Sequence, residues 1–184
     1  MTFDNYEFKK YIVNAIKDLG FQELSDIQKL VLDNIKSDKN IIAMSKTGSG
    51  KKHDFLLPIF NDLVEEEKSC QAVIVAPTLE LARQIYKVAQ HIASFSPNTI
   101  TVKAYYGGTD MEREMEKIKS NPPQIVVATP GKLVDLAIDE NILKIHLAKY
   151  FVMDEADMIA DSFLEDVFKI SEKFKEAKKM VFSA

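Results

Sequence analysis

Short apolar runs separated by longer helical patterns are the feature that most restricts the fold of this chain. The runs Ala72–Ala76, Ile125–Ala128 and Tyr150–Met153 are typical of strands buried on both faces of a sheet. Further strands are expected at Ile41–Ala43, Ile100–Tyr106 and Met180–Phe182. Strands that alternate with helices form a parallel sheet with helices on both faces. We therefore predict an α/β fold.

The helical segments are recognised by apolar residues at helical spacing, with turn and capping residues between them. Gly20 is the expected end of the first helix, and Ser25 and Asp26 offer N-caps for the second. The expected helices are Phe8–Leu19, Ile27–Ile35, a segment through Phe55 and Ile59, Glu80–Phe95, Met111–Ile118, Leu133–Ile138 and Phe163–Phe174.

The length of 184 residues is enough for one domain with a good core. No internal repeat, linker or change of composition divides the sequence, and 46% hydrophobic with 28% charged residues argues against disorder. We expect a single domain over 1–184, in which residues 1–36 build two helices ahead of the first strand.

The net charge of −4 excludes binding of nucleic acid through bulk positive charge, so any such contact must be local. The single cysteine, Cys70, excludes an internal disulfide and indicates a reducing compartment, and its place before a buried strand predicts a packing role. No apolar run approaches the roughly 20 residues that span a bilayer. We expect a cytoplasmic protein without a membrane partner.

A glycine-containing loop that ends in Lys51 joins the first strand to a helix. Glycines let backbone N–H groups point at one anion, the helix adds its positive N-terminal end, and the lysine supplies a mobile charge. The segment departs from the phosphate-loop pattern G-x-x-x-x-G-K-[ST] at Ser45 and Lys52. An ordinary strand-to-helix turn with surface lysines is the alternative interpretation.

Several further motifs follow directly after predicted strands, and the carboxyl ends of parallel strands share one edge of the sheet. These motifs are Pro77-Thr78, Gly107-Gly108, Thr129-Pro130-Gly131 and Asp154-Glu155. We predict that Asp154 holds Mg²⁺ through water and that Glu155 polarises an attacking water. Alternatively, both acids are exposed loop residues that cap the next helix.

With these motifs in this order, the chain resembles the first RecA-like domain of a DEAD-box RNA helicase over essentially its whole length. Asp154-Glu155-Ala156-Asp157 spells the family's name. The other similar segments, in chain order, are Gly20-Phe21 through Gln28 with Phe3 upstream, Ser45–Lys52, Pro77–Ala82, Gly107-Gly108, Thr129–Lys132 and Ser183-Ala184.

The resemblance implies a RecA-like phosphate-loop NTPase fold that uses ATP and Mg²⁺, with catalytic Lys51, Asp154 and Glu155. It implies that Gln28 reads the adenine edge and that Phe21 packs on the ring. The alternative interpretations are that Phe21 is a core residue and that Gln28 is an exposed polar residue of a helix. The implied phosphate-binding residues are Ser45, Lys46, Thr47, Gly48, Ser49, Gly50, Lys51 and Lys52. The implied RNA-binding residues are Pro77, Thr78, Gly108, Thr129, Gly131 and Lys132, and Ser183 and Ala184 would couple hydrolysis to duplex opening.

The sequence departs from the family pattern at four positions that bear on ATP and RNA binding. Lys52 replaces the hydroxyl that binds Mg²⁺, and an ammonium group cannot coordinate a metal. Leu79 replaces an arginine, Lys132 keeps a charge without the bidentate fork of arginine, and Leu24 replaces a proline. Together these differences suggest weakened RNA binding or a diverged member of the family. Lys52 and Leu79 are the grounds for the alternative of a degenerate nucleotide- or RNA-binding module with little or no ATP turnover.

The resemblance also sets expectations about partners. A second RecA-like domain, which would supply arginines to the phosphates and half of the RNA cleft, does not follow in this sequence. We therefore expect a monomer that binds RNA weakly alone and neither unwinds RNA nor hydrolyses ATP appreciably. Joined to its second domain, it would be the ATP-binding part of an ATP-dependent RNA helicase.

Overall fold

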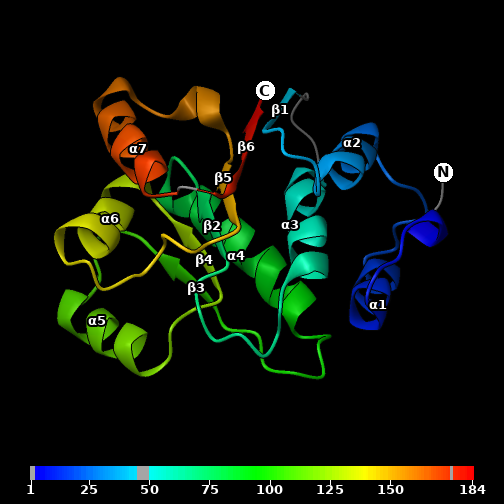
Figure 1. Cartoon of the computed structure of the whole chain (residues 1–184), viewed down its shortest axis with the longest axis horizontal. Coiled ribbons are helices and arrows are strands. Elements are labelled where there is room, and N and C mark those ends of the chain that lie inside the picture. Colours follow the sequence, from blue (N-terminus) through cyan, green and yellow to red (C-terminus); the bar gives the residue numbers. More distant parts are fainter. Residues whose placement is uncertain (1–2, 45–49, 175) are drawn as a thin grey trace.

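A computed structural model describes residues 3–44, 50–174 and 176–184 of the chain. Within these ranges the strands form one parallel sheet of six, in the order β1-β6-β5-β2-β4-β3 (Figure 1). The strands are β1 (Ile41–Met44), β2 (Ala72–Val75), β3 (Val102–Tyr105), β4 (Ile125–Ala128), β5 (Tyr150–Met153) and β6 (Lys178–Ser183). The predicted α/β fold with a parallel sheet is confirmed.

Helices lie on both faces of the sheet. The helices are α1 (Lys10–Asp18), α2 (Asp26–Asn34), α3 (Lys51–Asp62), α4 (Leu79–Ala93), α5 (Met111–Ser120), α6 (Pro130–Val134) and α7 (Asp161–Lys173). A π-helical turn, Asp135–Asp139, continues α6, and single 3₁₀ turns cover Phe3–Asn5 and Ala156–Met158. One face is covered by α3 and α4, with α1 and α2 packed outside α3, and the other by α5, α6 and α7.

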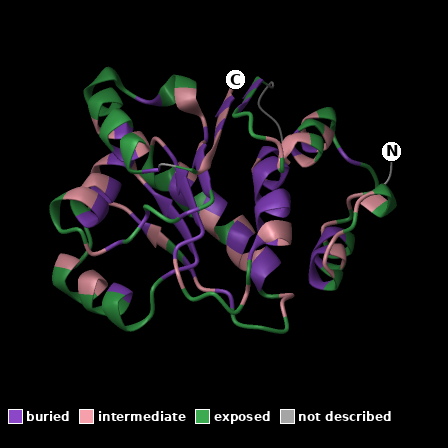
Figure 2. Ribbon diagram, in the orientation of Figure 1, coloured by how far each residue is buried: buried purple, intermediate pink, exposed green. Residues whose placement is uncertain are grey.

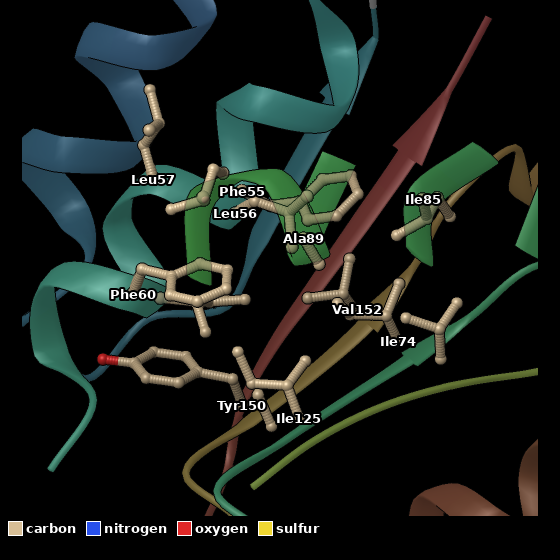
Figure 3. Packing of buried hydrophobic residues seen from close by; sticks show 14 of the residues in the cluster. Phe55, Leu56, Leu57, Phe60, Ile74, Ile85, Ala89, Ile125, Tyr150 and Val152 are labelled. Atoms are coloured by element: carbon tan, nitrogen blue, oxygen red, sulfur yellow. The ribbon is translucent and has the colours of Figure 1, made fainter. Parts of the chain in front are cut away.

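The core is densest around α3, which lies between the sheet and the outer helices. Phe55 and Phe60 have no exposed surface, and they pack with Ile85 of α4 and with Ile74 and Val152 of the sheet (Figure 3). Burial is concentrated in the central strands and in α3 (Figure 2). Most residues of α3 are buried, so packing on both sides determines where this helix starts at the sheet edge.

The edge strand β1 differs from the sequence prediction. Ile42 and Met44 are 76% and 75% exposed, because no helix of the described residues covers that side of β1. The predicted cover on both faces therefore holds for β2 and β4, which are wholly buried, but not for β1. Apolar composition alone cannot separate a strand that is buried twice from one that is buried once.

Local contacts explain where the first helices end. Gly20 has φ +71°, a left-handed conformation that favours glycine and ends helix α1. The Lys178 ammonium of β6 donates to the carbonyl oxygens of Asn34, Ser37 and Lys39 at 2.6–2.7 Å, so it binds the end of α2 to the sheet.

Cys70 is buried beside β2, as predicted. Among the described helices, none has both the length and the apolarity needed to cross a membrane.

Candidate functional site

The carboxyl ends of the parallel strands share one edge, and predicted site residues from distant parts of the sequence lie there together. Met44 of β1 is paired with Ser183 of β6. The Lys51 ammonium donates to the backbone carbonyl oxygen of Ser183 at 3.4 Å. Ser183 donates in turn through Oγ to Asp157 Oδ1 at 2.9 Å, which also accepts the N–H of Ala184 at 3.2 Å. The end of the last strand is thus tied both to the phosphate-loop lysine and to the acidic motif.

The phosphate-loop residues fall only partly within the described ranges. Those outside are Ser45, Lys46, Thr47, Gly48 and Ser49. Gly50 precedes α3 with φ +124°, where a side chain would be strained. Lys51 is the first residue of α3 and is only 8% exposed. Because α3 starts at the strand-end edge, its positive N-terminal end and the Lys51 ammonium both favour an anion there.

The acidic pair after β5 has one buried member. Asp154 is 1% exposed, and its Oδ1 accepts the Glu155 N–H at 3.0 Å. Burial raises the pKa of Asp154, as does the adjacent Glu155, while Lys52 and Lys51 lower it. Glu155 has φ +49° and makes no side-chain cap to the following 3₁₀ turn. The capping alternative is therefore wrong: Asp154 is buried and Glu155 does not cap.

These side chains fit a magnesium ion that is shared with phosphate. Mg²⁺ keeps several waters and is usually bound through one or two carboxylates plus phosphate oxygens. The buried Asp154 carboxylate can supply that contact, and among the described residues no cluster of three or more His, Cys, Asp or Glu competes with it. Lys52 lowers the pKa of the same carboxylate, so its positive charge acts on Asp154.

Gln28 is held in a capping box at the start of α2. Its Oε1 accepts the Ser25 N–H and its own N–H donates to Ser25 Oγ, both at 3.0 Å. Gln28 is 5% exposed, so the alternative of an exposed polar residue is wrong. Ser25 Oγ also donates to Asp54 Oδ1 at 3.3 Å. The predicted adenine-reading residue is thereby linked to a carboxylate on α3.

Asp54 is a site residue that the sequence analysis missed. It is 4% exposed, and burial raises its pKa to about 6 despite hydrogen bonds from Ser25 and Gln28 and attraction to Lys51. The available signal was an acid one turn after Lys51, directly before the apolar run Phe55–Phe60. A buried carboxylate with this pKa lies beside the predicted nucleotide contacts, where perturbed groups tend to occur.

Phe21 packs edge-on against His53 of α3, with ring centroids 5.0 Å apart. Phe21 is only half-buried, which leaves ring surface for a ligand. His53 is 8% exposed and neither ring nitrogen has a hydrogen-bond partner among the described residues. Burial lowers the pKa of His53 to about 4, with repulsion from His91 and Lys52 adding to the effect. A neutral imidazole therefore supports the Phe21 ring.

The predicted RNA-binding residues after β2, β3 and β4 lie along the same edge. Thr78 caps α4, with Oγ1 accepting the Leu81 N–H at 3.2 Å, while Pro77 follows the buried Ala76 after β2. Gly108 has φ +84°, and the Thr129 N–H donates to Tyr105 O at 3.1 Å, so the turns after β3 and β4 are joined. Gly131 continues the second turn as part of α6.

Lys132 differs from the other residues of this group because its side chain turns inward. Its ammonium lies 2.7 Å from Glu114 Oε2 and contacts Thr109 Oγ1 at 3.2 Å and Met111 Sδ at 3.3 Å. The Lys132 side chain is 6% exposed. In this arrangement its charge joins α6 to α5 and does not face solvent, so direct RNA contact by Lys132 stays a prediction.

Comparison with known proteins gives a consistent result. A family model described as DEAD/DEAH box helicase matches residues 25–184. The chain is 44% identical over 184 residues to the DEAD-box ATP-dependent RNA helicase CshB of Listeria monocytogenes, covering 99% of this chain and 42% of that protein. It is 42% identical over 185 residues to CshB of Bacillus subtilis, with the same coverage of 99% and 42%. The chain thus spans less than half the length of these relatives.

Solved structures agree with the sequence matches. The fold is similar to that of a DEAD box protein from the hyperthermophile Methanococcus jannaschii, with a TM-score of 0.90 and 32% identity. The similarity covers all of this chain and 50% of that one.

Proposed function

This chain belongs to the DEAD/DEAH box helicase family, and we propose that it is the ATP-binding RecA-like domain of an ATP-dependent RNA helicase. The observation that supports this most strongly is the meeting of Lys51, Ser183 and the acidic motif at one sheet edge. The relatives named above are called ATP-dependent RNA helicases, which favours turnover over a degenerate binding module.

Each side chain then has a defined part in the reaction. Lys51 and the N-terminal end of α3 hold the β- and γ-phosphates. Bound Mg²⁺ would neutralise phosphate charge, held by Asp154 through water. Glu155, on the left-handed turn beside Asp154, polarises the attacking water. Phe21 packs on the adenine ring. Gln28 hydrogen-bonds the adenine edge through the N–H and the oxygen lone pair that its amide keeps beyond its bonds to Asp54 and Ser25.

RNA and a second RecA-like domain are the proposed partners. The residues after β2, β3 and β4 form a backbone-rich track, which suits contacts to phosphate and sugar without reading of base sequence. Ser183 and Ala184, bonded to Asp157 of the acidic motif, would transmit the state of the nucleotide to this track.

The test of this proposal is ATP hydrolysis by the full-length protein with and without single-stranded RNA. We expect RNA to stimulate hydrolysis, because RNA and nucleotide are bound along one edge. A Lys51→Ala variant should lack the stimulated rate. If the full-length protein binds ATP but turns it over equally slowly with and without RNA, the degenerate-module alternative is correct and the helicase proposal is wrong.

A further inference from the structure

Arg83 is an exposed cation near the proposed RNA track that no motif assigns. It lies on α4 one helical turn after Leu79, and residues four apart share a helix face. Leu79 is 38% exposed and carries no charge. Arg83 is therefore the positive charge closest to the first turn of α4 on this face of the helix.

The Arg83 side chain is held in place by Tyr106. The guanidinium carbon lies 5.1 Å from the centroid of the Tyr106 ring, a cation–π contact, and Nε donates to the tyrosine hydroxyl at 3.4 Å. Tyr106 immediately precedes Gly107 and Gly108. A guanidinium has five N–H donors, and in the described part of the chain only Nε–H of Arg83 has a partner. The remaining donors are available to a phosphate.

The placement of cations near the track supports this assignment, and the acid of the first turn of α4, Glu80, forms no ion pair with Arg83 in the described part of the chain. Lys132, the cation of the adjacent turn, is buried against Glu114 and does not offer its charge to solvent. The chain as a whole carries a net charge of −4, so RNA cannot be held by bulk attraction and needs placed cations. Arg83 is exposed, oriented by an aromatic ring, and adjacent to the glycine turn.

We propose that Arg83, stacked on Tyr106, binds a backbone phosphate of single-stranded RNA. This inference rests on the proposed function, because it places a further contact on the same RNA track. It assigns recognition of the phosphate backbone and not of a base, since the guanidinium already lies over the Tyr106 ring and keeps its Nη–H donors for an anion.

The test is RNA affinity of the full-length protein as a function of salt. Fluorescence anisotropy of a labelled oligouridine, with a non-hydrolysable ATP analogue, gives the slope of log K against log[KCl]. Each phosphate contact to a single strand contributes about 0.7 to that slope. Arg83→Ala should reduce the slope by about 0.7 and weaken binding about fivefold or more at low salt. Arg83→Lys, which keeps the charge, should retain the wild-type slope.

The matched control is Lys87→Ala, which removes the same charge from an exposed position of α4 one turn further on. It should bind RNA with the wild-type slope. An Arg83→Ala slope equal to that of the wild type, or an equal decrease in Lys87→Ala, would overturn the assignment. If the wild-type protein itself fails to bind the oligonucleotide, the proposed function is wrong as well, so the two failures can be told apart.

Discussion

Replacing Lys132 by methionine is expected to lower the free energy of unfolding by about 3 kcal/mol. The Lys132 ammonium and Glu114 Oε2 are 2.7 Å apart, and their side chains are 6% and 17% exposed. Removal of one partner leaves the other charge largely buried without compensation, which is the costly case. The loss is at the lower end of the usual range because Glu114 keeps some contact with solvent. Urea denaturation at pH 7 measures it.

A double variant distinguishes the lost ion pair from lost packing. With Lys132→Met and Glu114→Leu combined, both charges disappear and the site becomes apolar, so we expect most of the stability to return. If the double variant is instead destabilised by the sum of the two single effects, the pair is not coupled. A loss below about 0.5 kcal/mol in Lys132→Met alone would show that the pair is as weak as an exposed one.

Replacing Asp54 by asparagine is expected to raise the free energy of unfolding at pH 8 by about 2 to 3 kcal/mol. Burial raises the pKa of Asp54 to about 6 in the folded chain, whereas an unfolded aspartate titrates near its ordinary value. The folded state therefore favours the protonated acid. Ionisation of the buried Asp54 carboxyl destabilises the folded state. This destabilisation is absent below about pH 4, grows as the pH rises to about 6, and is complete above that pH. Asparagine is always neutral and removes this destabilisation.

Chemical denaturation of the wild type and of Asp54→Asn at pH 4 and pH 8 checks this prediction. The stability gain should be present at pH 8 and nearly absent at pH 4. The control is Glu116→Gln, which removes an exposed negative charge from α5. It should change the free energy of unfolding only slightly, and by a similar amount at pH 4 and pH 8. An Asp54→Asn variant that is less stable than the wild type at pH 8 would contradict the account.

The sheet was predictable because its central strands carry short uninterrupted apolar runs, such as Val73–Val75 and Val126–Ala128, that alternate with helical patterns along the chain. The position of the candidate site at one edge of the sheet was also predictable, because the motifs that contain Thr78, Thr129 and Asp154 each come after a strand of a parallel sheet. The contact between Lys51 and Ser183 follows from the pairing of β1 with β6, which the alternating pattern does not specify.

Other features depended on side-chain partners that no local pattern reveals. Lys132 belongs to a motif for RNA contact, but Glu114 of another helix determines where its charge lies. Asp54 stands between His53 and an apolar run, and only the fold shows that its carboxylate meets Ser25. Ile42 has the character of a core residue, yet the side of β1 on which it lies is left uncovered by the described helices.

The central claim is that this sheet edge binds ATP through Lys51 and the start of α3. Isothermal titration of ATP with Mg²⁺ into the full-length protein and its Lys51→Ala variant tests it most directly. We predict saturable binding at one site by the wild type and an affinity at least about tenfold lower in the variant, equivalent to about 1.4 kcal/mol. Equal ATP affinity in a wild type and a Lys51→Ala variant that are both folded would contradict the account.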